Sequence, residues 1–69
     1  MKFYFIGIKG SGMSSLASLL KQDGNEVIGK DVEKYIYTQK ELQKKGIQVL
    51  SLEDRSYLNG NYYVVVGHD

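Results

Sequence analysis

Residues 3–20 read FYFIGIKGSGMSSLASLL, and this stretch decides the fold. It begins with an apolar run, continues through a cluster of glycines at positions 7, 10 and 12, and ends in a segment whose apolar side chains recur at helical spacing. This order predicts a buried strand, a tight turn and a helix. Such an arrangement aims free backbone N–H groups and the positive end of a helix dipole at one place, which favours an anion, usually phosphate.

Two glycine motifs compete for the turn. The mononucleotide P-loop, GxxxxGK followed by Ser or Thr, matches Gly7 and Gly12 but has Met13 where the lysine must stand, so ATP binding through this loop is not expected. The dinucleotide motif GxGxxG matches the same two glycines but has Lys9 at its middle glycine. Gly10 is then the residue that lets a pyrophosphate approach, with the charge of Lys9 beside it. The alternative is that the glycines only permit a tight turn, but the flanking strand and helix favour phosphate binding.

Composition excludes several classes of protein. The chain has 69 residues, enough for one small domain, and a chain this short buries only about 60% of its unfolded surface. Its net charge of +1 gives no electrostatic case for nucleic acid or an anionic membrane. The absence of cysteine excludes disulfides and thiolate metal sites and favours an intracellular protein. Without a membrane-length apolar run or a signal peptide, we expect a cytoplasmic protein.

The first half of the chain predicts a βαβ unit. A strand is expected at residues 2–8, buried on both faces, and a helix at residues 12–23. Ser11 is a candidate N-cap, and Gly24 stands where a left-handed residue ends a helix. A short strand follows at residues 26–29.

The second strand leads to an acidic residue at a suggestive distance. Asp31 follows Gly12 by nineteen residues, close to the ~20 at which a dinucleotide fold places an acid that binds ribose hydroxyls. Spacing alone supports a solvated loop carboxylate equally well. Lys30 either pairs with solvent-facing groups or favours a phosphate.

The second helix has a clear start signature. Thr38 and Glu41 form a capping box, and Tyr37 with Leu42 can form the hydrophobic staple around it. Residues 32–37 are expected to be a loop whose tyrosines could stack on a ligand base, although packing on the helix is the commoner role.

The remaining elements complete a parallel sheet. The second helix ends at Gly46, a third strand is expected at residues 47–50, a helical turn at 53–58 and a fourth, doubly buried strand at 62–66. Strands alternating with helices predict an α/β fold, a Rossmann-like doubly wound sheet of order 3-2-1-4 that is incomplete after its fourth strand. The open edge at residues 62–66 predicts self-association.

The chain reverses between the first and fourth strands, where ligands bind in such folds. This places the turn at residues 7–12 opposite Gly67 and His68. A lone histidine has no second imidazole to support a metal site, and the serines at 11, 14 and 15 have no positioned base. We therefore expect neither metal binding nor hydrolase chemistry.

Three segments together resemble the amino-terminal domain of the Mur ligase family: GIKGSGMSSLA at 7–17, GKDVEKYIYTQ at 29–39 and KKGIQVL at 44–50. The resemblance covers nearly all of the chain and keeps its spacing. It points to the branch that adds L-alanine to UDP-N-acetylmuramate with ATP, the first amino-acid addition of peptidoglycan synthesis. In the Gram-positive form of that branch the loop commonly reads GIKGSGMS, so Lys9 is ordinary there.

The resemblance implies that residues 1–69 are part of the UDP-sugar-binding domain of a three-domain ligase. ATP, magnesium and alanine would bind to later segments, so this chain alone would be inactive and hold no catalytic or metal-binding residues. The resemblance implies that the substrate is bound by Lys9, Gly10, Ser11, Gly12, Met13 and Asp31. Asp31 would face the uridine side, and the residues of the turn would face the diphosphate.

Two positions depart from the family pattern. The family usually has a serine where this chain has Lys30, and often Asn-Ala where it has His68 and Asp69, so neither Lys30 nor His68 receives a role. The alternative functions are an NAD(P)-binding Rossmann domain of a dehydrogenase or regulatory protein, which the spacing of Asp31 favours and Lys9 opposes, and a non-catalytic nucleotide-sensing module.

Overall fold

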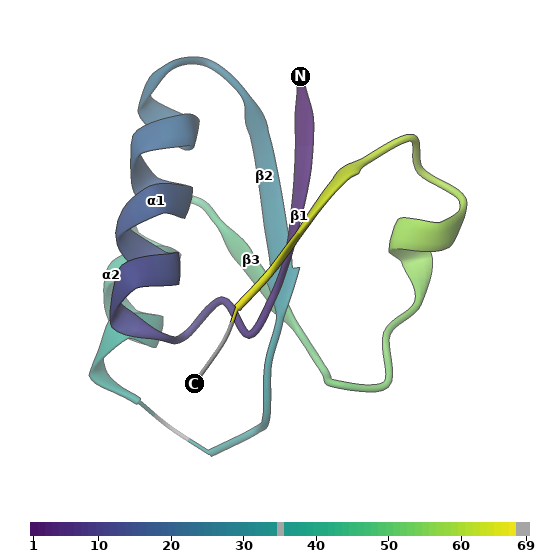
Figure 1. Ribbon diagram of the computed structural model, residues 1–69. Coiled ribbons are helices and arrows are strands. Elements are labelled where there is room, and N and C mark those ends of the chain that lie inside the picture. The colour runs from purple at the N-terminus through teal and green to yellow at the C-terminus, as the bar shows by residue number, and fades with distance from the viewer. Residues whose placement is uncertain (35, 68–69) are drawn as a thin grey trace.

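The computed structural model describes residues 1–34 and 36–67. It consists of a parallel sheet with two helices packed against it (Figure 1). Within these residues the neighbouring strands are all parallel and lie in the order β3-β2-β1-β4, which confirms the predicted fold class and strand order. Along the chain the elements are β1 (Lys2–Ile6), α1 (Ser11–Gln22), β2 (Glu26–Lys30), α2 (Tyr37–Lys44), β3 (Gln48–Leu50), the short 3-10 helix η1 (Ser56–Leu58) and β4 (Tyr63–Val66).

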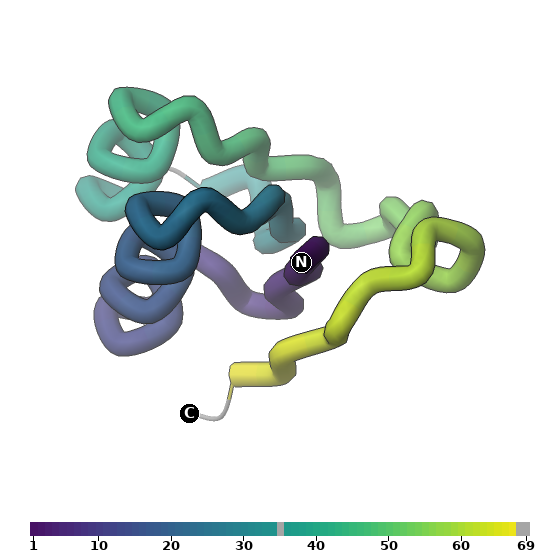
Figure 2. Tube along the Cα trace, turned by 90° about the horizontal axis from the view of Figure 1, so that it is seen from above, coloured from purple at the N-terminus to yellow at the C-terminus, as the bar shows by residue number. Residues whose placement is uncertain are grey.

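The sheet separates two unlike layers. Helices α1 and α2 cover one face, and the β3–β4 connection with η1 lies on the other, as both views show (Figures 1 and 2). Consecutive side chains of β1 are buried on opposite faces of the sheet. Tyr4 and Phe5 point to opposite sides, and both are fully buried. The predicted burial of β1 on both faces is therefore confirmed at its centre. The core between sheet and helices consists of Phe5, Ile8, Ala17, Val27, Leu42 and Ile47.

Both helices end at the glycines that the sequence indicated. Gly24 and Gly46 have φ of +89° and +76°, in the left-handed region. After α1, the N–H of Gly24 donates to Lys21 O and that of Asn25 to Leu20 O, and the equivalent pair of bonds follows α2. This is the Schellman arrangement, which satisfies carbonyls at the end of a helix.

The predicted helix starts are wrong in detail. Helix α1 begins at Ser11 with Gly10 as its N-cap, and no side chain of the described chain caps it. Helix α2 begins after Ile36, also without a side-chain cap among the described residues. Thr38 cannot complete a capping box, because it is buried and its hydroxyl donates to the carbonyl of Lys9. Tyr37 is 71% exposed, so it does not form the predicted staple.

A polar network holds the β3–β4 connection on the second face of the sheet. The Tyr4 hydroxyl donates to Asp54 Oδ2 at 2.6 Å, and the Ser56 N–H and hydroxyl donate to the same oxygen. The Lys30 ammonium donates to the Asp54 carbonyl at 2.9 Å and lies 5.0 Å from the ring centre of Tyr57. Lys30 is thus buried on the face opposite the helices, where it anchors this connection.

Strand β4 is the exposed edge of the described sheet. Tyr63, Val64 and Val66 are exposed, and Val65 packs partly against the core. The predicted burial of this strand on both faces is therefore wrong for the chain as described, because no further element covers it among these residues. Self-association through the β4 edge remains a prediction.

The turn after β1 depends on close packing between Ile8 and Gly29. A Cβ placed on Gly29 would lie 2.6 Å from Ile8 Cδ1, 2.8 Å from Ile8 Cβ and 2.8 Å from the Phe5 carbonyl oxygen. The last two atoms cannot move aside cheaply, because one is close to the backbone and the other belongs to it. Only glycine allows Ile8 to fill this part of the core.

We therefore predict that Gly29→Ala lowers the free energy of unfolding by about 1–3 kcal/mol, as overpacking does. Gly12→Ala is the matched control, because a Cβ at Gly12 meets no neighbouring atom of the described residues within 4 Å. It should change stability by less than about 1 kcal/mol. Urea unfolding measures both, and equal stability of the two variants would contradict this packing.

The Tyr4–Asp54 bond makes stability depend on acidity. The pKa of the Asp54 carboxyl lies below its ordinary value of 3.8, mainly because the Tyr4 hydroxyl donates a hydrogen bond to it and then because Ser56 does. A lowered pKa means that the folded state binds protons less readily than the unfolded state. The stability from this carboxylate is therefore present above pH 3.8 and lost as the pH falls through the lowered pKa.

We predict that Tyr4→Phe lowers the thermal unfolding midpoint at neutral pH, and that the difference from the unsubstituted chain shrinks on acidification below pH 3.8. Tyr63→Phe, which removes the hydroxyl of an exposed tyrosine, is the control and should leave the pH profile unchanged. A constant offset between Tyr4→Phe and the unsubstituted chain across the acid range would disprove the proposed linkage.

Candidate functional site

The first turn of α1 presents unpaired backbone donors. In the part of the chain that the structure describes, the N–H groups of Ser11, Gly12 and Met13 have no acceptor, whereas the next one, of Ser14, donates to Gly10 O at 2.8 Å. Ser11 and Gly12 are exposed. The start of a helix carries the positive end of its dipole, so these donors favour an anion.

The three glycines of the turn have different roles. Gly7 has a φ of +85°, and its N–H donates to the Lys30 carbonyl, so the fold itself requires glycine there. Within the part of the chain that the structure describes, a Cβ on Gly12 would meet nothing within 4 Å, and one on Gly10 would make only ordinary contacts, the nearest at 3.6 Å. The fold does not need these two positions to be bare. Among the described residues, the space around Gly12 is therefore open, and a ligand can approach the helix backbone there.

Lys9 is turned away from that opening. It is only 3% exposed, and its ammonium donates to the carbonyls of Val32 at 2.7 Å and Lys34 at 3.0 Å, both in the β2–α2 connection. Its backbone N–H donates to Asp31 Oδ2 at 2.8 Å. The structure therefore joins Lys9 to the end of β2 and assigns its side chain to the protein interior.

Asp31 lies beside the turn, as the spacing predicted. Its two carboxylate oxygens accept bonds from the backbone N–H groups of Lys9 and Val32, the latter at 2.7 Å. Each oxygen keeps a further lone pair, and the residue is partly exposed. Ribose binding by Asp31 stays a prediction, and its established contacts are those that fasten the turn.

Met13 packs on the backbone that follows β4. A Cβ on Gly67 would lie 3.1 Å from Met13 Cγ, and the methionine side chain adjoins the core. The glycine turn therefore lies close to Gly67, as the predicted reversal between β1 and β4 required. The side chain of Met13 is thus used for packing, and its backbone N–H is left without an acceptor among the described residues. His68, predicted at the same place, lies outside the described residues, as does Tyr35.

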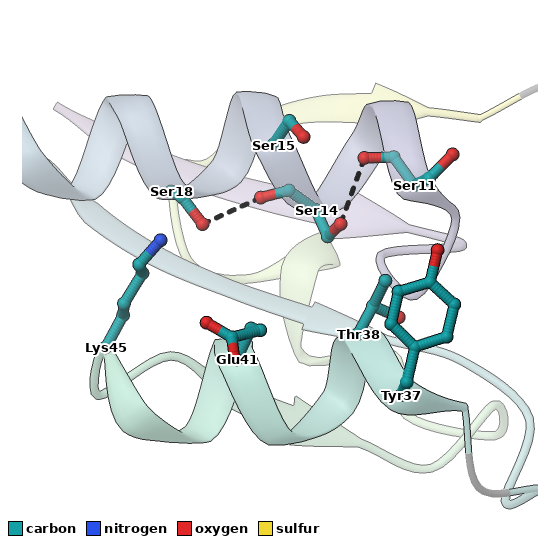
Figure 3. Close-up of a pocket in the computed structure, with 8 residues that line it drawn as sticks. All are labelled: Ser11, Ser14, Ser15, Ser18, Tyr37, Thr38, Glu41 and Lys45. Atoms are coloured by element: carbon teal, nitrogen blue, oxygen red, sulfur yellow. Dashed lines mark hydrogen bonds between the residues drawn. The ribbon is translucent and has the colours of Figure 1, made fainter.

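A groove of about 270 Å³ separates α1 from α2 (Figure 3). Ser14 and Ser18 point from α1 toward α2, but their hydroxyls donate to the carbonyls of Ser11 and Ser14 in the preceding turn. Such bonds use the donors that a ligand would need. The groove is lined by Ser11, Ser14, Ser15, Ser18, Tyr37, Thr38, Glu41 and Lys45.

Residues 1–34 and 36–67 contain neither a cluster of metal-ligating side chains nor a membrane-spanning helix. Across these residues, His, Asp and Glu side chains nowhere gather in threes that could hold a metal ion. Neither helix there has the length and apolar character needed to cross a membrane.

The sequence patterns missed the part that Thr38 plays. Its hydroxyl reaches the Lys9 carbonyl from the start of α2 and so ties the second helix to the glycine turn. The only signal was a capping pattern, which places a hydroxyl at the right end of the helix but aims it at the wrong partner.

The chain belongs to the Mur ligase family. The family profile described as "Mur ligase family, catalytic domain" matches residues 2–68.

Individual relatives carry a more particular name. The chain is similar to UDP-N-acetylmuramate–L-alanine ligases of Streptococcus pneumoniae, for example those of strains Hungary19A-6, CGSP14 and 70585. Each is 47% identical over 66 residues, which cover 96% of this chain and 15% of the relative. The chain thus spans about one seventh of the length of these curated relatives. No solved structure matches it.

Proposed function

We propose that this chain is the UDP-N-acetylmuramate-binding part of a cytoplasmic, ATP-dependent ligase that adds L-alanine to that substrate in peptidoglycan biosynthesis. The observation that carries the proposal is the first turn of α1, where three backbone N–H groups lack an acceptor among the described residues and the space around Gly12 is open. The names and similarity of the relatives support the choice of substrate over a nicotinamide dinucleotide.

In this proposal the diphosphate accepts hydrogen bonds from the N–H groups of Ser11, Gly12 and Met13. Preformed donors at a helix start stabilise phosphate charge without rearrangement, and the dipole adds to the attraction. The uridine side of the substrate extends toward Asp31, whose carboxylate fixes the end of β2 beside the turn.

The residues of this chain do not fit ATP and magnesium. The loop has Met13 where a P-loop needs lysine, and the described part of the chain has no carboxylate cluster for a divalent cation. Carboxylate activation by ATP is therefore assigned to segments of the ligase outside these residues.

We predict that the chain binds UDP-N-acetylmuramate with a dissociation constant of about 1 mM, equivalent to about 4 kcal/mol. The expected value is weak because only part of the ligand is contacted. In an NMR titration, the amides of residues 10–14 should shift most. NAD should bind more weakly, and stronger binding of NAD would contradict the proposed substrate.

Gly12→Val should abolish this binding, because its side chain would fill the open space around Gly12, through which the diphosphate approaches the backbone in this proposal. The fold should persist, because no neighbouring group of residues 1–34 and 36–67 lies within 4 Å of the added Cβ. Gly24→Ala is a control for a glycine change far from the site, where the cost is in stability alone, since Gly24 has a positive φ. Binding that survives Gly12→Val would place the ligand elsewhere.

We also predict that the chain alone releases no phosphate above background from ATP in the presence of L-alanine and UDP-N-acetylmuramate. The physical reason is the missing P-loop lysine and carboxylate cluster described above. Turnover by the purified chain would contradict the division of labour between this part and the rest of the ligase.

A further inference from the structure

We infer that Lys9 is a positioning residue, which holds the glycine turn in its binding geometry without touching the ligand. The inference rests on the proposed function for the identity of that ligand, the diphosphate of a UDP-sugar. It replaces the sequence-based expectation that the lysine charge lies beside the pyrophosphate.

Every polar group of Lys9 binds a distant part of the chain. Its N–H donates to Asp31, and its carbonyl accepts from the Thr38 hydroxyl at the start of α2. Its ammonium bridges the carbonyls of Val32 and Lys34. One residue therefore fastens the turn to the end of β2, to the β2–α2 connection and to the first turn of α2.

Burial explains why the ammonium stays where it is. Lys9 is 3% exposed, and a buried cation is tolerated only when its donors are satisfied. Two carbonyls at 2.7 and 3.0 Å satisfy two of its three donors. Swinging the ammonium toward the ligand would break both bonds and leave the two carbonyls without this donor.

The position of Lys9 in the chain turns this anchoring into an effect on binding. It directly precedes Gly10, whose carbonyl accepts the Ser14 N–H and whose own N–H donates to Gly7 O at 3.2 Å. Fixing Lys9 on both sides therefore fixes the direction in which the N–H groups of Ser11 and Gly12 point. Preorganised donors bind more tightly, because the ligand does not have to order them.

The test compares three variants of the chain. Lys9→Met keeps the length of the side chain but removes the ammonium, and Thr38→Val removes the bond to the Lys9 carbonyl without changing any charge. Lys40→Met, at an exposed position of α2, is the control for the loss of one positive charge. For each, UDP-N-acetylmuramate binding is titrated at several salt concentrations, and hydrogen exchange of the Gly10 amide is compared with that of the core amides of Phe5 and Val27.

We expect Lys9→Met to weaken binding about tenfold. Thr38→Val should weaken binding about fivefold and leave its salt dependence unchanged. Losses of this size are expected when buried hydrogen bonds are removed. Exchange of the Gly10 amide should rise in both variants by more than that of Phe5 and Val27. A role limited to overall stability would raise all three alike. Lys40→Met should change neither binding nor exchange by more than about twofold.

Two results would overturn the inference. One is that Thr38→Val binds normally while Lys9→Met loses both affinity and part of the salt dependence, which would mean that the ammonium contacts the diphosphate. The other is that Gly10 exchange stays unchanged in both variants. If the unsubstituted chain does not bind the UDP-sugar, the proposed function fails, and Gly10 exchange still decides whether Lys9 positions the turn. If Lys9→Met does not fold, Thr38→Val decides it.

Discussion

The packing of Ile8 on the bare backbone of Gly29 is the constraint from which the site follows. It brings the chain sharply back over the end of β2, where the N–H groups of Gly7 and Ile8 both donate to the Lys30 carbonyl. The next residue, Lys9, then meets Asp31 and the β2–α2 connection, and α1 starts directly beyond it. A side chain at position 29 would displace this whole succession of contacts.

The resulting site consists mainly of backbone. Side chains surround it for support: Asp31 and Thr38 bind the main chain of Lys9, and Met13 packs against Gly67. A phosphate site of this kind needs donors in fixed directions and open space in front of them more than it needs charged side chains. The groove between α1 and α2 is richer in polar side chains, but two of its hydroxyls are committed to the helix backbone.

Local patterns sufficed to predict the strand order, the helix ends and the place of the glycine turn. Gly24 and Gly46 have no side chain that could make contacts elsewhere in the fold. Their left-handed geometry therefore follows from their place directly after a helix. The helix starts were not predictable in this way, because the Thr38 hydroxyl finds a better partner in a buried carbonyl 29 residues away. The direction of Lys9 likewise depends on carbonyls that only the folded chain brings within reach. The roles of Lys9 and Asp31 toward the substrate remain predictions.

The location of the diphosphate is the central claim, and a crystal structure of the chain with UDP-N-acetylmuramate tests it most directly. We expect diphosphate oxygens within hydrogen-bond distance of the N–H groups of Ser11, Gly12 and Met13, with the Lys9 ammonium still on the carbonyls of Val32 and Lys34. A diphosphate in the groove between α1 and α2, or one bound by the Lys9 ammonium, would contradict it.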